Sequence, residues 1–159
     1  MGYRIGEKVI HCTFGLGEIT KIDAKVINGQ LVDCYVIQLS DMTIWVPMDD
    51  SGQSSLRAPT PPAEFVNTLP ILSSPNESLL EDRVLRKKQL TDQLKDGKLS
   101  SICRVVRDLR YYQRNSKLND QERSILDRAV KSLLTEWTFT MGTPQHQAYQ
   151  TMESMLLAN

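Results

Sequence analysis

Residues 18–47, EITKIDAKVINGQLVDCYVIQLSDMTIWVP, carry alternating apolar positions on both sides of an Asn28-Gly29 pair. Both residues of this pair accept positive φ, which makes the pair a strong signal for a β-hairpin. The alternation predicts strands over residues 18–27 and 32–39. It also predicts a third strand over 42–47, in which Ile44 and Val46 share one face and Trp45 lies on the other. Pro47 then ends this strand or marks it as an edge strand.

The residues before this hairpin fit the same β architecture. Residues 8–13 form a short apolar segment, and Gly15-Leu16-Gly17 follows as part of a tight turn. The Gly, Lys and Ser/Thr that would complete a phosphate-binding loop are missing after Gly17. Short strands joined by tight turns predict a small, strongly bent sheet or SH3-like barrel over residues 1–57.

The residues after 57 are typical of helices. We expect a short helix with Thr60 as N-cap and prolines in its first turn, and a second over 77–95 with Leu80, Val84, Leu90 and Leu94 facing inward. A third helix over 99–114 has an apolar stripe at Ile102, Val105, Val106 and Leu109. A capping-box signal at Asn119–Glu122 begins a fourth helix that stops before Gly142, and Thr143-Pro144 begins the last. The predicted fold class is therefore α+β, a small barrel followed by an all-helical domain of about five helices over 58–159.

The net charge of zero hides a strongly uneven distribution. Residues 1–82 hold 5 basic and 11 acidic residues, residues 83–131 hold 14 basic and 6 acidic, and residues 132–159 hold 2 acidic and no basic ones. A basic segment between acidic ones indicates either a surface that binds a polyanion or a helix face that is simply solvated.

Catalytic and metal-binding motifs are missing from the sequence. The cysteines Cys12, Cys34 and Cys103 are widely spaced, and the two histidines are far apart. We therefore expect reduced thiols in a cytoplasmic protein, with no metal and no cofactor. Carboxylates scattered over turns and helix faces do not form the pairs that acid–base catalysis needs, so we expect no enzyme activity and no small-molecule substrate. No apolar run approaches the roughly 20 residues of a membrane span.

Basic side chains in the second and third predicted helices are the candidate site for nucleic acid. One cluster lies in the second helix, and a stripe at spacings of three and four residues lies in the third: Arg83, Arg86, Lys87 and Lys88, then Arg104, Arg107, Arg110 and Arg114. A basic helix face can bind phosphates, although pairing with Asp108 or other acidic neighbours would explain the same pattern.

These motifs together resemble the CarD/CdnL-type family of bacterial RNA polymerase-binding transcription regulators. The resemblance lies in Gly6-Glu7-Lys8-Val9, Gly15-Leu16-Gly17, Asn28-Gly29 before Tyr35-Val36-Ile37, the strand end at Val46-Pro47, and Val105-Val106-Arg107-Asp108-Leu109 followed by residues 118–129. It covers most of the chain in the same order and spacing.

The resemblance implies an N-terminal Tudor-like domain that docks on the RNA polymerase β subunit by strand addition and polar contacts. Transcription-repair coupling factor carries the same type of domain. Lys25 and Trp45 match positions at which family members often carry polymerase-contacting arginines. Lys25 keeps the positive charge, whereas Trp45 would make an apolar or stacking contact or would simply cover the sheet.

For the helical domain, the resemblance implies contact with promoter DNA near the melted region, where a tryptophan often wedges into the minor groove. That position corresponds to about Arg83, and no tryptophan lies between Trp45 and Trp137. Trp137 itself is expected to be a core residue. The leading hypothesis is a regulator that binds polymerase and, without sequence specificity, promoter DNA, and so modulates open-complex formation or stability. The alternative is a protein–protein adaptor that has no DNA-binding role.

Overall fold

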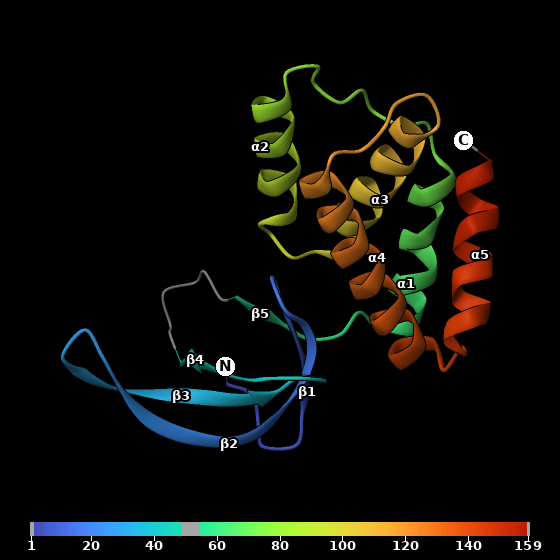
Figure 1. Cartoon of the computed structure of the whole chain (residues 1–159). Helices are drawn as coiled ribbons and strands as arrows, with labels where there is room; N and C mark the ends of the chain where they lie inside the picture. Colours follow the sequence, from blue (N-terminus) through green and yellow to red (C-terminus); the bar gives the residue numbers. More distant parts are fainter. Residues whose placement is uncertain (1, 49–54, 159) are drawn as a thin grey trace. The chain divides into compact units, whose positions relative to one another are not determined.

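The computed structural model describes residues 2–48 and 55–158, which form two compact units that divide between Pro59 and Thr60. The first unit is a five-stranded antiparallel sheet, and the second consists of helices (Figure 1). This confirms the predicted α+β class with a β unit before a helical one.

The strands of the first unit are β1 (Lys8–His11), β2 (Gly15–Ile27), β3 (Gln30–Gln38), β4 (Thr43–Pro47) and β5 (Leu56–Arg57). They pair in the order β4-β3-β2-β1-β5. The sequence did not predict β5, whose two residues pair with Ile10 and His11 of β1. The core of this unit consists of seven buried side chains: Val9, Ile19, Tyr35, Ile37, Leu39, Val46 and Leu56.

Two local features shape the long β2–β3 hairpin (Figure 1). Asn28 (φ 51°) and Gly29 (φ 79°) form its turn, which confirms the hairpin prediction. A β-bulge lies at Thr20, because Ile19 pairs with Ile37 whereas Lys21 pairs with Val36. Such a bulge bends the strand and increases its twist, as a small, strongly curved sheet requires.

Gly17 occupies a position in β2 where the sheet leaves no room for a side chain. A Cβ atom there would lie 2.6 Å from Ile37 Cγ2 and 2.9 Å from Leu39 Cδ2. Both neighbours are themselves buried in the core of this unit. The glycine therefore permits the close approach of β2 to the core side chains of Ile37 in β3 and Leu39 just after it.

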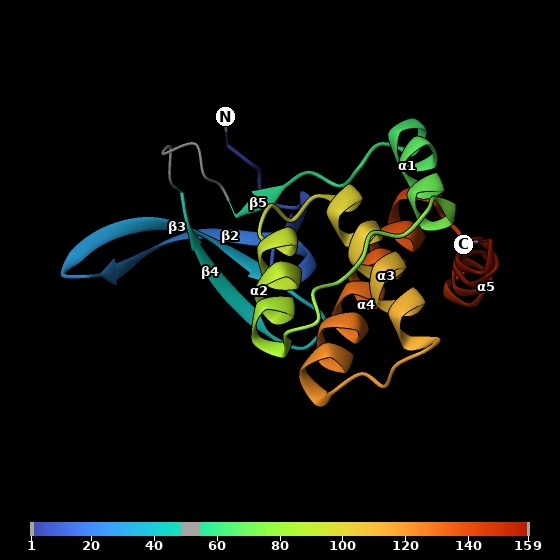
Figure 2. The same cartoon turned by 90° about the horizontal axis from the view of Figure 1, so that it is seen from above.

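The helical unit consists of α1 (Pro62–Thr68), a 3-10 helix (Leu69–Ser73), α2 (Arg83–Leu94), α3 (Leu99–Gln113), α4 (Asp120–Met141) and α5 (Gln145–Leu157). Helix α3 packs against all four other α-helices (Figures 1 and 2). Its apolar stripe is buried as predicted. Trp137 is only 5% exposed, and its ring centroid lies 5.8 Å from that of Phe65. The predicted core role of Trp137 is therefore confirmed.

The ends of several helices follow their sequence signals. Asn119 and Glu122 form the predicted capping box at the start of α4. Gly142 ends α4 with φ 66°, in the left-handed region that favours glycine.

The start of α1 and the start of α2 differ from the prediction. Thr60 is not an N-cap, because its backbone N–H donates to Glu136 Oε2 (2.8 Å) and Pro61 precedes the helix. Helix α2 begins at Arg83, and the Asp82 carboxylate caps it by accepting hydrogen bonds from the backbone N–H groups of Val84 and Leu85. The expectation that Leu80 and Val84 face inward is wrong: the first precedes the helix, and both are exposed.

Candidate functional site

Lys25 and Trp45 lie on one face of the β unit and contact each other. Lys25 pairs with Val32 of β3, and Trp45 pairs with Val36. Because these β3 residues are four positions apart, their cross-strand partners project from the same face. The Lys25 Nζ atom lies 5.0 Å from the centroid of the Trp45 ring, in cation–π geometry, and Trp45 is 41% exposed. The structure thus brings together the two residues at which the family resemblance implies polymerase contacts.

Strand β4, which carries Trp45, is an edge strand of the sheet among the described residues. The bond from the Met48 N–H to the Asp33 carbonyl (2.9 Å) continues the β3–β4 ladder. Ladder bonds of an antiparallel pair involve every second residue, so the even-numbered residues of β4 bond to β3. The backbone N–H and C=O groups of Thr43 and Trp45 therefore point outward, where another strand could pair with them.

Three predicted DNA-contacting residues are exposed on α2, namely Arg83, Lys87 and Lys88. Lys88 Nζ contacts Asp92 Oδ2 at 2.7 Å, and both of these side chains face solvent. Next to Arg83, Val84 is 76% exposed and Leu85 is 53% exposed. Sequence reasoning missed this apolar pair on a basic surface, because helical periodicity had assigned Val84 to the core.

Arg86 is directed into the protein and not toward solvent. It is 6% exposed and forms an ion pair with the Glu122 carboxylate, which is 2% exposed. Its NH1 group donates to the Leu80 carbonyl (3.1 Å) and the Glu81 carbonyl (3.0 Å), and its guanidinium lies 5.0 Å from the Tyr112 ring centroid. The hydrogen bond that Arg86 donates to the Glu122 carboxylate raises the pKa of Arg86 above its usual range. Arg86 therefore links α2 and the preceding segment to the start of α4.

Arg107 is also buried, at 5% exposure. Its Nε donates to Asp108 Oδ1 (2.9 Å), and its NH1 donates to Ser74 Oγ (2.8 Å). The same Asp108 oxygen accepts from the Glu77 backbone N–H (3.0 Å). This network fixes the segment between the 3-10 helix and α2 against α3.

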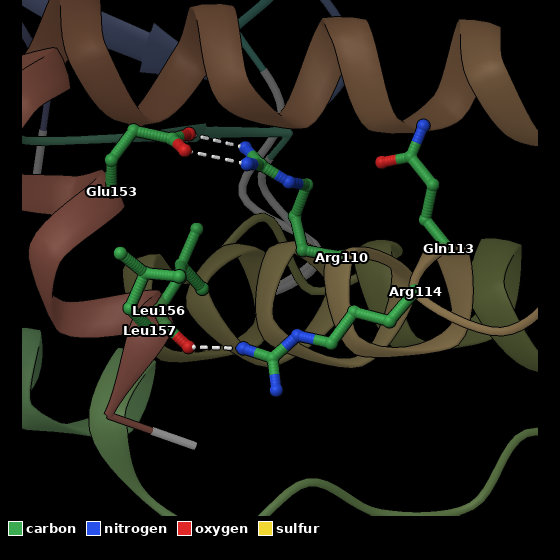
Figure 3. A pocket seen from close by; sticks show the side chains of 6 residues that line it. All are labelled: Arg110, Gln113, Arg114, Glu153, Leu156 and Leu157. Carbon is green, nitrogen blue, oxygen red and sulfur yellow. Dashed lines mark hydrogen bonds and ion pairs between the residues drawn. The ribbon is translucent and has the colours of Figure 1, made fainter.

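Arg110 and Arg114 contact helix α5 (Figure 3). The Arg110 guanidinium forms a bidentate ion pair with the Glu153 carboxylate, in which the distance from NH2 to Oε2 is 2.7 Å. This hydrogen bonding raises the pKa of Arg110 and lowers that of Glu153. Arg114 NH2 donates to the Leu156 carbonyl (2.8 Å), and both arginines line a pocket of about 250 Å³.

The predicted arginine stripe of α3 is therefore not a continuous solvent-exposed basic face, although Arg114 at its end is exposed. Arg104 is half-buried, and Arg107, Arg110 and Arg114 have partners within the chain. The arginines do recur at helical spacing, but α3 is the central helix and packs against other helices on most of its sides. The charge distribution held a signal for one partner, since residues 132–159 contain acidic residues and no basic ones, and Glu153 is one of them.

The described residues hold no group of three or more His, Cys, Asp or Glu side chains that could bind a metal ion. All three cysteines are free thiols. Burial raises the pKa of Cys103 to about 12, which makes it a poor nucleophile at neutral pH. Over residues 2–48 and 55–158, no helix is long and apolar enough to cross a membrane.

Two models of known protein families match the chain, one over the β unit and one over most of the helical unit. The family model described as "CarD-like/TRCF RID domain" matches residues 3–58, and the model described as "CarD, C-terminal domain" matches residues 67–153. The Bacillus subtilis (strain 168) protein named "Putative transcription factor YdeB" is 27% identical over 147 residues, which cover 91% of this chain and 96% of that protein. Both matched models describe transcription-factor or RNA polymerase-interaction domains and not enzymes. The chain therefore belongs to the CarD-like family of transcription regulators, which interact with RNA polymerase.

Proposed function

We propose that the β unit docks on the β subunit of RNA polymerase through the Lys25–Trp45 face and the outer edge of β4. The observation that carries this proposal is the Lys25 ammonium 5.0 Å from the Trp45 ring, beside a strand edge with outward-pointing backbone groups. A strand of the partner would pair with Thr43 and Trp45, while Lys25 would meet an acidic or carbonyl group. The exposed indole adds apolar contact area with little loss of side-chain entropy.

The binding test uses the purified β-subunit lobe and the full chain. We expect Lys25→Glu to weaken binding at least about fivefold, because it places a negative charge where a positive one met the partner. Lys131→Glu makes the same charge change on the exposed surface of α4 and serves as the matched control. Equal affinity of Lys25→Glu and wild type, or no binding by wild type, would contradict this docking site.

We further propose that α2 contacts promoter DNA without sequence specificity. Arg83 and Lys87 would contact phosphates. Lys88 would also contact a phosphate after its exposed ion pair with Asp92 opens. Val84 and Leu85 lie exposed among these cations, and an apolar side chain between two base steps can hold a minor groove open. This arrangement offers a substitute for the missing tryptophan.

The proposed consequence is a shift of the promoter-opening equilibrium. Polymerase docking would supply most of the affinity, and α2 would stabilise one state of the DNA more than another. The test compares open-complex lifetime on one promoter with wild type and with Arg83→Ala/Lys87→Ala. The variant is expected to bind the β lobe normally and to lose the change in lifetime. An effect on lifetime equal to that of wild type would refute the role of α2.

One observation favours the protein–protein adaptor as a second candidate. Five of the eight cations predicted to bind DNA have partners within the chain, namely Arg86, Lys88, Arg107, Arg110 and Arg114. The adaptor hypothesis predicts that Arg83→Ala/Lys87→Ala leaves both the DNA affinity and its salt dependence unchanged. A weaker, less salt-dependent association would exclude the adaptor hypothesis.

A further inference from the structure

The side chain of His11 closes the turn between β1 and β2, which consists of residues 12–14. Its Nδ1 atom accepts hydrogen bonds from the backbone N–H groups of Thr13 (3.0 Å) and Phe14 (3.3 Å). A bond from the N–H two residues later is the pattern by which Asn and Asp side chains form turns. His11 therefore takes the place of an Asn or Asp here, with a ring nitrogen as the acceptor.

These two bonds depend on the protonation state of the imidazole. A nitrogen that accepts a hydrogen bond carries no proton, so His11 is neutral in this arrangement and its proton lies on Nε2. In the imidazolium both ring nitrogens are donors, so no rotation of the ring would restore an acceptor. Protonation of His11 therefore breaks both bonds and directs an N–H group toward the N–H groups of Thr13 and Phe14.

The Phe14 ring offsets only part of this loss. Its centroid lies 5.1 Å from that of the His11 ring, and the two planes are inclined by 35°. A positive charge on His11 would be attracted to the phenyl ring, but Phe14 is 49% exposed and cation–π contacts at exposed sites are weak. The contact does not replace two hydrogen bonds to backbone N–H groups.

The charged side chains of the strands that pair around His11 project away from it. His11 pairs with Gly15 of β2 and with Leu56 of β5, so these residues share its face of the sheet. The charged residues of the same ladders lie on the opposite face: Lys8, Glu18 and Arg57. An ion pair within these ladders therefore does not control the titration of His11.

The other titratable groups of this region are neutral in acid. Among the described residues, the turn holds the Cys12 thiol, and the core of the β unit holds the phenols of Tyr3 and Tyr35. Thiols and phenols are uncharged below neutral pH. Burial is the cause that lowers the pKa of His11. The response of this turn to acid therefore depends on His11 itself.

The turn is also bonded to the segment that enters β5. The Cys12 N–H donates to the Ser55 carbonyl (2.9 Å), one residue before β5, and His11 pairs with Leu56. Because β5 has only two residues, these few contacts hold it against β1 (Figure 1). Opening of the turn would therefore loosen the strand from which the chain continues into the helical unit.

We propose that His11 is a pH-sensitive switch of the β unit: the neutral side chain holds the β1–β2 turn closed, and its protonation opens the turn and weakens the pairing of β1 with β5. The pKa of His11 is lowered from 6.5 in the folded state, so the unfolded chain takes up this proton more readily. The stabilisation is therefore complete above pH 6.5 and is lost as the pH falls through the lower pKa of the folded state. This inference does not depend on polymerase or DNA binding.

The first test is an NMR titration of the full chain between about pH 8 and pH 5, where histidine changes its charge. The chain has two histidines, and His146, which is exposed on α5, is the internal reference. We expect the amide signals of Thr13 and Phe14 to shift with the same midpoint as the His11 ring, below pH 6.5, and not to follow His146. A His11 midpoint at or above 6.5, or amide signals that do not follow the His11 ring, would overturn the proposal.

The second test is urea unfolding at several pH values, followed through Trp45 in a Trp137→Phe background. The folding equilibrium constant of the β unit should fall about tenfold for each unit by which the folded pKa of His11 lies below its unfolded value. His11→Asn should lack this part of the pH dependence, because its Oδ1 accepts the same two bonds and takes up no proton. The control His146→Gln should keep it. A His11→Asn variant as acid-sensitive as wild type would refute the switch, and if this variant does not fold, the NMR titration of wild type decides.

Discussion

Replacing Arg86 with alanine is expected to destabilise the helical unit by about 3–5 kcal/mol, the usual cost of removing one partner of a buried ion pair. The substitution leaves the Glu122 carboxylate, 2% exposed, without its cationic partner. It also removes the donor to the Leu80 and Glu81 carbonyls and the contact with the Tyr112 ring. By contrast, Arg83→Ala three residues earlier changes an exposed side chain and should cost less than about 0.5 kcal/mol.

Urea unfolding followed by tryptophan fluorescence would measure this difference. The chain has two tryptophans, so a Trp45→Phe background leaves only Trp137, which reports on the helical unit. With a denaturant slope of about 1.5 kcal/mol/M, a loss of 4 kcal/mol lowers the midpoint by about 2.7 M. In the same background, Arg86→Met/Glu122→Gln removes both charges of this ion pair and keeps a capping side chain at the start of α4, so it should recover part of the loss. A loss below about 1 kcal/mol for Arg86→Ala, or no recovery in the double variant, would refute the assignment of Arg86 as a buried structural ion-pair partner.

Three further predictions concern other parts of the chain. Arg110 lowers the pKa of Glu153 in the folded state below 4.5, the value in the unfolded chain. The pair therefore contributes its full stabilisation at pH values above 4.5, and this contribution disappears as the pH falls through the lower pKa of the folded state. Stability of Glu153→Gln should therefore approach that of wild type in acid and fall below it at neutral pH, as thermal unfolding at several pH values would reveal; a pH-independent difference would contradict this. A thiol reagent at pH 8 should modify the exposed Cys12 quickly and the buried Cys103 only after unfolding, because burial raises the Cys103 pKa to about 12; fast modification of Cys103 in the native protein would count against this. Gly17→Ala should destabilise the β unit by about 1–3 kcal/mol through overpacking, and an unchanged unfolding midpoint would show that β2 can shift freely.

Features determined by neighbouring residues could be predicted from the sequence. The Asn28-Gly29 turn, the Asn119–Glu122 capping box and the buried stripe of α3 all depend on short-range patterns, and the structure contains each of them. The contact between Lys25 and Trp45 could be predicted only in part. The resemblance selected both residues, but whether they meet depends on the strand register, which the sequence does not give.

Features determined by distant residues could not be predicted. Strand β5 has only two residues, and its pairing with β1 depends on chain folding over more than 40 positions. The start of α2 was placed too early because Leu80 fits a helical period, whereas the Asp82 carboxylate caps the helix two residues later. Asp108, the ion-pair partner of Arg107, is adjacent in sequence, and the sequence offered it as a possible partner. The partners of Arg107, Arg110 and Arg114 in other elements lie 33 to 43 residues away, so spacing alone could not separate internally paired arginines from a solvated basic face.

The position of β5 in the sheet has a mechanical consequence if the protein binds RNA polymerase and promoter DNA together, as proposed. Strand β5 ends at Arg57 and the helical unit begins at Thr60, so tension between the units is delivered to β5 within a few residues. In the strand order, β5 lies at one end and β4 at the other, with three strands between them. A pull from the helical unit would thus load the short β1–β5 ladder first, and this ladder would yield while the Lys25–Trp45 face kept its shape. The sheet therefore separates the strand that bears the load, β5, from the strand that carries Trp45, β4, so that loss of the β1–β5 pairing would leave the β3–β4 pairing intact.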